Sequence, residues 1–333
     1  HRIIAALTLT LSLPTLAATP LKVETIVEGL SAPWAFDFLP DGRLLVTERA
    51  GRLRVIENGS LQEAPIAGVP TVHHAGQGGL LDVLIDRDFA TTQRLFLSFA
   101  HRDRGGNATR VVSARLENGT LLDVRELFTA SPRQRTAVHY GGRLLQLQDQ
   151  LMLTLGDGFD YREDAQKPDS HHGKIVVFPM TGGAPVVWSL GHRNVQGLVR
   201  DPASGTIYAH EHGPRGGDEI NRIEQGANYG WPVATFGVDY SGAVISPHTS
   251  RPGMVDPLLV WTPSIAPSGM TLYGGSLFPD WRGDLFVSAL AGRQLVRVRL
   301  GTGAPTQEVL LENLRERFRD VAEGPDGALC VLT

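Results

Sequence analysis

PWAFDFLPDGRLLVT, residues 33–47, is the stretch that decides the fold. Two apolar runs flank Asp41-Gly42, and this arrangement predicts a hairpin because Asp and Gly tolerate the positive φ that tight turns require. Residues 319–331, RDVAEGPDGALCV, nearly repeat the stretch, with a second Pro-Asp-Gly turn at 325–327. The chain therefore returns near its end to the structural unit with which it begins.

Four further copies of this unit lie between the two. Their paired runs are residues 78–83 with 94–98, 141–145 with 151–154, 196–199 with 206–209, and 268–272 with 284–287. Six units of roughly 45 to 70 residues, without amphipathic helices between them, are typical of a propeller and not of a parallel α/β fold. We predict an all-β protein, a six-bladed β-propeller of four-stranded antiparallel blades. The insertions at 160–172 and 212–262 are expected to be loops on one face.

Composition and the N-terminal segment argue against a nucleic-acid-binding protein and for an exported one. The 333 residues carry a net charge of −4, and no cluster of Lys and Arg is interleaved with aromatic residues, which argues against a nucleic-acid partner. Residues 1–18 have a basic start, a short apolar core and small residues at the exit, the order of a signal peptide and not of a membrane span. With the single cysteine Cys330, this predicts a periplasmic or secreted protein. One domain, residues 19–333, is expected to follow, and its last strand is expected to be truncated at Thr333.

Polar residues and glycines gather at the ends of the predicted strands, where side chains of a propeller converge. They occur in four places, which are residues 76–82, residues 139–144 with 156–158, residues 191–197 with 211–220 and 228–232, and residues 317–320. Each place alone has a structural explanation, because glycines close turns and Arg–Asp pairs connect blades. Their combination is harder to explain in that way.

At these residues the sequence closely resembles the soluble aldose and glucose dehydrogenases that depend on pyrroloquinoline quinone (PQQ). The likeness spans residues 23–333 and is most specific in GHRNVQG (191–197) and EHGPRGGDEI (211–220). It implies oxidation of an aldose at C1 to a lactone, with PQQ and Ca²⁺ as cofactors and an external electron acceptor. The implied assembly is a monomer or homodimer.

The resemblance also assigns roles to individual residues. Sugar oxidation needs a base of near-neutral pKa, and His139 matches the family's base, with Asp157 as the carboxylate that orients it. The third implied catalytic residue is Arg193, which would polarise the quinone. The implied cofactor-binding residues are Gln77, Arg193, Asn194, His212, Arg317 and Arg319. The implied calcium ligands are the carbonyls of Gly213 and Pro214, with a second ion near Asp218, Glu219 and Tyr229.

Some positions depart from the family pattern. A lysine that reaches the cofactor is replaced by Ala291, and Arg293 could supply the charge if it stays on the same strand. Val138 and residues 262–264 replace residues of glucose specialists, which favours broad aldose specificity. Two alternatives stay open. One is a Ca²⁺-dependent lactonase or other hydrolase, and the other is a non-catalytic propeller that binds glycans.

Overall fold

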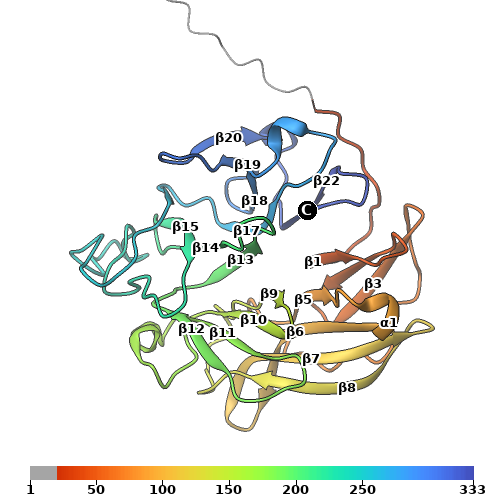
Figure 1. The fold of residues 1–333 in the computed structure, drawn as a ribbon. Coiled ribbons are helices and arrows are strands. Elements are labelled where there is room, and N and C mark those ends of the chain that lie inside the picture. Colours follow the sequence, from red (N-terminus) through yellow and green to blue (C-terminus); the bar gives the residue numbers. More distant parts are fainter. Residues whose placement is uncertain (1–20) are drawn as a thin grey trace, which may run out of the picture.

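Antiparallel sheets arranged around a centre make up the protein in this computed structural model, which describes residues 21–333 (Figure 1). In chain order the sheets are β1–β4 (Pro33–Phe38, Leu44–Glu48, Arg52–Glu57, Ser60–Leu61), β5–β8 (Leu80–Ile85, Arg94–Asp103, Gly106–Glu117, Thr120–Thr129), β9–β12 (Leu144–Leu147, Gln150–Leu155, Lys174–Pro179, Val186–Leu190), β13–β16 (Val195–Arg200, Ile207–Glu211, Asp218–Ile223, Leu259–Trp261), β17–β20 (Pro267–Leu272, Leu285–Ala289, Gln294–Arg299, Thr306–Leu310) and β21–β22 (Asp320–Glu323, Leu329–Leu332). Within each sheet neighbouring strands are consecutive in the chain.

The all-β propeller of four-stranded blades is confirmed, but the count of six such blades is wrong. Five sheets have four strands, and the sixth unit is the two-stranded sheet β21–β22. Residues 319–333 supply one hairpin, and no other segment of residues 21–333 pairs with it.

The first strand of each sheet lies nearest the centre, and these strands close a ring. β1 contacts β5, β5 contacts β9, and the contacts continue through β13 and β17 to β21, which contacts β1 again. The apolar core lies between consecutive sheets, as in the buried cluster that joins Leu45 and Leu53 of the first sheet to Leu80 and Leu95 of the second. Polar groups at the strand ends are thereby brought together at the centre.

Helices are short. They are α1 (Phe89–Thr92) and the 3₁₀ turns η1 (Arg162–Gln166), η2 (Pro279–Trp281) and η3 (Glu312–Leu314). No helix in the described part is long and apolar enough to cross a membrane. The predicted signal peptide at 1–18 lies outside the described residues.

The two long insertions contact each other. Nε2 of Gln166, in η1, donates a hydrogen bond to the carbonyl of Trp231 at 2.7 Å. The prediction that all of 212–262 is loop is wrong, because β15 and β16 fall within it and pair with each other. The glycines at 213, 216 and 217 precede β15 and mask its short alternating pattern.

Candidate active site

One buried guanidinium, that of Arg143, connects the sheets at the centre of the ring. It comes from the segment before β9, and each of its five contacts belongs to a different sheet. These contacts are Oδ1 of Asp82 and Oδ2 of Asp320 (both 3.2 Å), the carbonyls of Gln196 (3.1 Å) and Ser268 (3.3 Å), and the indole of Trp34 (4.6 Å to the ring centre). The sequence motif contained Arg143, but nothing local in it indicated contacts so distant along the chain.

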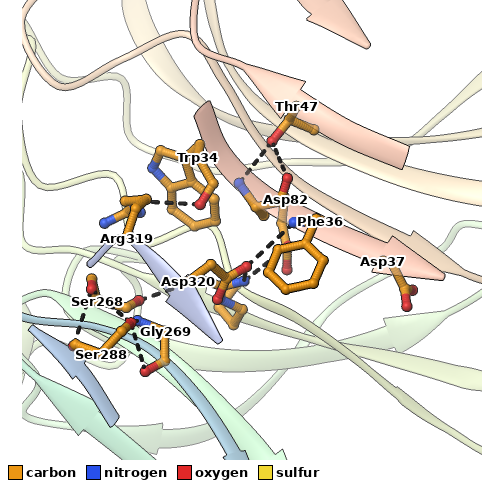
Figure 2. A network of polar contacts seen from close by, with 12 residues as sticks. Trp34, Phe36, Asp37, Thr47, Asp82, Ser268, Gly269, Ser288, Arg319 and Asp320 are labelled. Carbon is orange, nitrogen blue, oxygen red and sulfur yellow. Dashed lines mark hydrogen bonds and ion pairs between the residues drawn. The ribbon is translucent and has the colours of Figure 1, made fainter. Parts of the chain in front are cut away.

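Carboxylates at the inner strands bind the backbone of the next sheet. Asp320 Oδ2 accepts the N–H of Phe36 at 3.3 Å, and Asp82 Oδ2 accepts that of Leu144 at 2.7 Å. Figure 2 shows Asp320 directed at the backbone of Phe36, with Arg319 beside Trp34. Burial raises the pKa of Asp82 to about 6; Arg143 opposes this shift and Asp320 adds to it. Two carboxylates thus share one guanidinium at the centre of the fold.

A histidine–carboxylate pair stands near this centre. His139 Nδ1 lies 2.7 Å from Oδ1 of Asp157, and both side chains are buried. The backbone N–H of His139 donates to Oε1 of Gln77 at 2.8 Å. With Nδ1–H donating to the carboxylate, Nε2 is left as the proton acceptor of the ring.

Asp157 is held as an anion by several donors. Its Oδ2 accepts the indole N–H of Trp231 at 2.8 Å, and its Oδ1 accepts the backbone N–H of Phe159 at 2.8 Å. Burial disfavours the charged carboxylate, but the hydrogen bond and charge of His139, together with the charge of Arg193, outweigh burial and lower the pKa of Asp157. The carboxylate therefore stays ionised and orients the imidazole.

The backbone at His139 requires a glycine on the neighbouring segment. His139 itself has φ +53°, in the left-handed region that few residues other than glycine adopt. Its carbonyl passes so close to Gly156 that a Cβ there would lie 2.1 Å from the oxygen. The Gly-Asp-Gly motif at 156–158 thus allows the close approach of the two segments.

Arg193 lies between β12 and β13 with its side chain against the glycine-rich loop 213–217. Nη1 donates to the carbonyls of Gly213 at 2.7 Å and His212 at 3.2 Å, and the guanidinium carbon lies 5.4 Å from the ring centre of Trp231. Its backbone N–H donates to Oε2 of Glu211 at 2.5 Å. Trp231 therefore contacts both Asp157 and Arg193. Through Trp231 the His139–Asp157 pair lies beside the guanidinium of Arg193.

Arg319 supplies a second guanidinium at the centre. Nε donates to the carbonyl of Trp34 and Nη2 to Oε1 of Gln196, both at 3.2 Å. Burial, with help from the charge of Arg143, lowers the pKa of Arg319 to about 9, so the group keeps its charge at neutral pH. Among residues 21–333 neither Arg193 nor Arg319 has a carboxylate within ion-pairing distance. Guanidinium groups without a direct ion-pair partner suit a polyanionic ligand.

Three of the predicted cofactor-binding residues are either exposed or already bonded to other parts of the protein. Arg317 is exposed and forms no hydrogen bond or ion pair with another described residue. Asn194 uses Oδ1 within the protein, accepting the N–H of Gly141 at 3.2 Å. Nε2 of His212 lies 2.7 Å from the carbonyl of Pro267, and burial lowers the pKa of His212 to about 3, which keeps it neutral.

The predicted calcium residues fall into two groups. Gly213 and Pro214 lie in the tightly packed glycine-rich loop, where a Cβ on Gly213 would lie 2.3 Å from the oxygens of Gly216 and Gly217. Asp218 binds the backbone of this loop through the N–H of Gly213 at 2.8 Å. Backbone carbonyls are ligands that a hard cation accepts, and in this structure the carbonyl of Gly213 accepts a hydrogen bond from Nη1 of Arg193 at 2.7 Å.

Glu219 and Tyr229 line a separate small pocket together with Asp256. Asp218 does not share it, because successive residues of β15 point to opposite faces. Burial and the nearby Glu211 raise the pKa of Glu219 well above its ordinary range. In the described part of the chain no three His, Cys, Asp or Glu side chains are grouped to hold a metal.

The structure shows where two departures from the family pattern lie, at residues 291–293 and at residues 262–264. β18 ends at Ala289, and Arg293 is an exposed turn residue with φ +52° before β19, so it does not share a strand face with Ala291 and the condition for it to supply the missing charge is not met. In 262–264, Oγ1 of Thr262 and Oγ of Ser264 accept the N–H groups of Gly217 and Gly216. That segment therefore holds the glycine-rich loop in place.

Comparison with known proteins identifies the family. The family model for glucose/sorbosone dehydrogenases matches residues 30–333. The chain belongs to this family. The aldose sugar dehydrogenase YliI of Escherichia coli is 38% identical over 338 residues, which cover 95% of this chain and 91% of that protein.

Solved structures of family members have the same fold as this chain. The apo form of the E. coli aldose sugar dehydrogenase superimposes with a TM-score of 0.89 and 38% identity over 93% of this chain and 95% of that one. The PQQ-bound form of the aldose sugar dehydrogenase from Streptomyces coelicolor gives 0.77 and 29% identity over 93% and 90%. The glucose/sorbosone dehydrogenase fold therefore extends over nearly all of the described residues.

Proposed function

We propose that this protein oxidises aldoses at C1 to lactones with PQQ and Ca²⁺ as cofactors, and that His139 is the general base. The observation that carries the proposal is the position of Trp231. Its indole N–H binds Asp157 at 2.8 Å and its ring lies under the Arg193 guanidinium. The Trp231 side chain thereby connects the His139–Asp157 pair, which can accept a proton, to the Arg193 guanidinium, which can bind an anion.

The residues at the centre fit the cofactor. PQQ is a planar trianion, and Arg193 and Arg319 offer guanidinium groups without carboxylate partners in the described structure. The carbonyls of Gly213 and Pro214 would hold Ca²⁺ beside it. When bound, PQQ supplies the quinone carbon that accepts the hydride from the sugar. Ala291 leaves this site without the family's lysine, so we expect weaker affinity for the cofactor.

The protein's own residues handle the proton. Nε2 of His139 accepts the proton of the anomeric hydroxyl as the hydride leaves C1, and the sugar becomes the lactone. The imidazolium that forms is stabilised by the ionised Asp157 at 2.7 Å. Gln77 holds the backbone of His139, so that the ring keeps its position during transfer.

The two alternatives are less well supported. A Ca²⁺-dependent hydrolase of the propeller type needs a central ion held by side-chain carboxylates, and residues 21–333 contain no grouping of three such ligands. A glycan-binding propeller gives no reason for the cationic groups at Arg193 and Arg319. Export to the periplasm, one domain over residues 19–333 and an external electron acceptor belong to the same proposal as the dehydrogenase.

The test is reconstitution of the purified protein with PQQ and Ca²⁺, followed by dye reduction with several aldoses. Reduction is expected only when both cofactors are present. His139→Asn is expected to lower kcat by roughly 10²–10⁴-fold while PQQ still binds. Absence of a bound quinone spectrum together with absence of turnover would overturn the proposal, and so would full activity of His139→Asn.

A further inference from the structure

Two large aromatic side chains stand exposed beside the proposed base. Phe159 and Tyr240 are 44% and 59% exposed, whereas His139 and Arg193 beside them are only 5% and 4% exposed. Their ring centres are 6.4 Å apart and their planes differ by 18°. They come from different loops, after β10 and between β15 and β16, and together present an apolar surface on the solvent side of the site.

Phe159 contacts both members of the His139–Asp157 pair. Its ring meets that of His139 edge to face, with centres 5.3 Å apart and an angle of 78°. Its backbone N–H donates to Asp157, the carboxylate that orients the base. A molecule that lies on the Phe159 ring is therefore within reach of His139.

Tyr240 is coupled to the guanidinium on the other side. Nη2 of Arg193 donates to its hydroxyl at 3.3 Å, and the guanidinium carbon lies 5.8 Å from its ring centre. Tyr240 sits in a tight turn in which the N–H of Gly242 donates to the carbonyl of Asp239 at 2.8 Å. The ring is thus presented by a constrained backbone.

Phe159 is also held in an unusual conformation. Its φ is +66°, and the N–H of Asp160 donates to the carbonyl of Gly158 at 2.8 Å across it. This three-residue turn is rare for a residue with a bulky side chain, and such conformations concentrate at functional sites. Folding keeps the Phe159 ring exposed beside the base instead of burying it.

We propose that Phe159 and Tyr240 form a saccharide-stacking platform, with Phe159 against the unit that is oxidised and Tyr240 against the next unit of the chain. The negative faces of aromatic rings attract the C–H face of a sugar, while its hydroxyl groups stay in water. PQQ is excluded as the occupant because a trianion requires the buried cations and not this exposed apolar surface. The inference rests on the proposed function and adds a preference for aldoses of two or more units.

The test compares glucose with maltose as substrates of the enzyme reconstituted with PQQ and Ca²⁺. Tyr240→Ala is expected to lower the ratio of kcat/KM for maltose to that for glucose at least fivefold, and Tyr240→Phe to retain most of it. Phe159→Ala is expected to lower kcat/KM for both sugars. Val244→Ala, which removes an exposed apolar side chain from the same loop, serves as control and leaves the ratio unchanged.

A binding measurement separates this inference from the proposed function. In saturation-transfer NMR, irradiation of aromatic protons is expected to transfer saturation to maltose in the unsubstituted protein and much less in Tyr240→Ala. Transfer that is absent, or the same in both proteins, overturns the platform whether or not any sugar is oxidised. An unchanged maltose-to-glucose ratio in an active Tyr240→Ala enzyme overturns it as well, and leaves the dehydrogenase activity standing.

Discussion

The indole N–H of Trp231 donates to Oδ2 of Asp157 at 2.8 Å, deep below the surface of the site. Trp231→Phe removes this donor and leaves a buried carboxylate oxygen without its partner. The pKa of Asp157 then rises, since a hydrogen bond to the charged form is lost. We expect kcat to fall about tenfold and the acid limb of its pH profile to move to higher pH.

Trp188→Phe is the matched control for this change. The indole nitrogen of Trp188 is buried and has no hydrogen-bond partner among the described residues, so its removal costs no such bond. Its pH profile should coincide with that of the unsubstituted enzyme. A coincident profile for Trp231→Phe would show that the indole does not support the carboxylate.

Gly156 is expected to be essential for the position of the base. A Cβ in Gly156→Ala would lie 2.1 Å from the carbonyl of His139, so the backbone that carries the imidazole must shift. A shift of about 1 Å at a reacting group can cost on the order of 10²-fold in rate. We expect kcat to fall by that order in stopped-flow dye reduction. Gly303→Ala, where a Cβ meets nothing within 4 Å, should be unaffected, and equal rates in the two variants would contradict the prediction.

Local patterns predicted the strands well because the turns carry their own chemistry. The Asp-Gly turns at 41–42 and 326–327 mark the first and last hairpins, and the alternating apolar runs of the other four units also pair as expected. The extent of the sixth sheet did not follow from the repeat, because one hairpin at 319–331 resembles the start of a complete blade.

Local sequence patterns did not predict the contacts at the centre of the ring. The role of Arg143 depends on partners 61 and 177 residues away along the chain. The sequence did not indicate which of Arg317 and Arg319 points to the centre. Side chains alternate between the two faces only within a strand, and β21 begins only at Asp320. Asp157, by contrast, follows His139 across one hairpin, and the structure places the two in contact.

Arg319 and Arg317 should differ sharply in cofactor binding. Arg319→Met removes a guanidinium held at the centre without a carboxylate partner in the described structure, and we expect the Kd for PQQ to rise roughly 10–100-fold, the loss of one charge-assisted hydrogen bond. Arg317→Met removes an exposed side chain and should leave the Kd nearly unchanged. Quenching of tryptophan fluorescence by the bound quinone measures both. Equal losses would instead support the role for Arg317 that the family resemblance implies.

Stability should depend on pH through Asp82, a buried carboxylate at the centre. The pKa of Asp82 is raised to about 6 in the folded protein, above the ordinary 3.8 expected for the unfolded chain. Between these values the folded state binds more protons, so stability decreases as pH rises from about 4 to 6. Asp82→Asn keeps an acceptor for the N–H of Leu144 and removes one titrating charge, and should make the Tm curve less steep in this window, where Asp37, with a pKa raised to about 7, still contributes. Asp41→Asn, at an exposed ion pair, should leave the slope of that curve unchanged; a slope equally steep in Asp82→Asn would rule out Asp82 as its source.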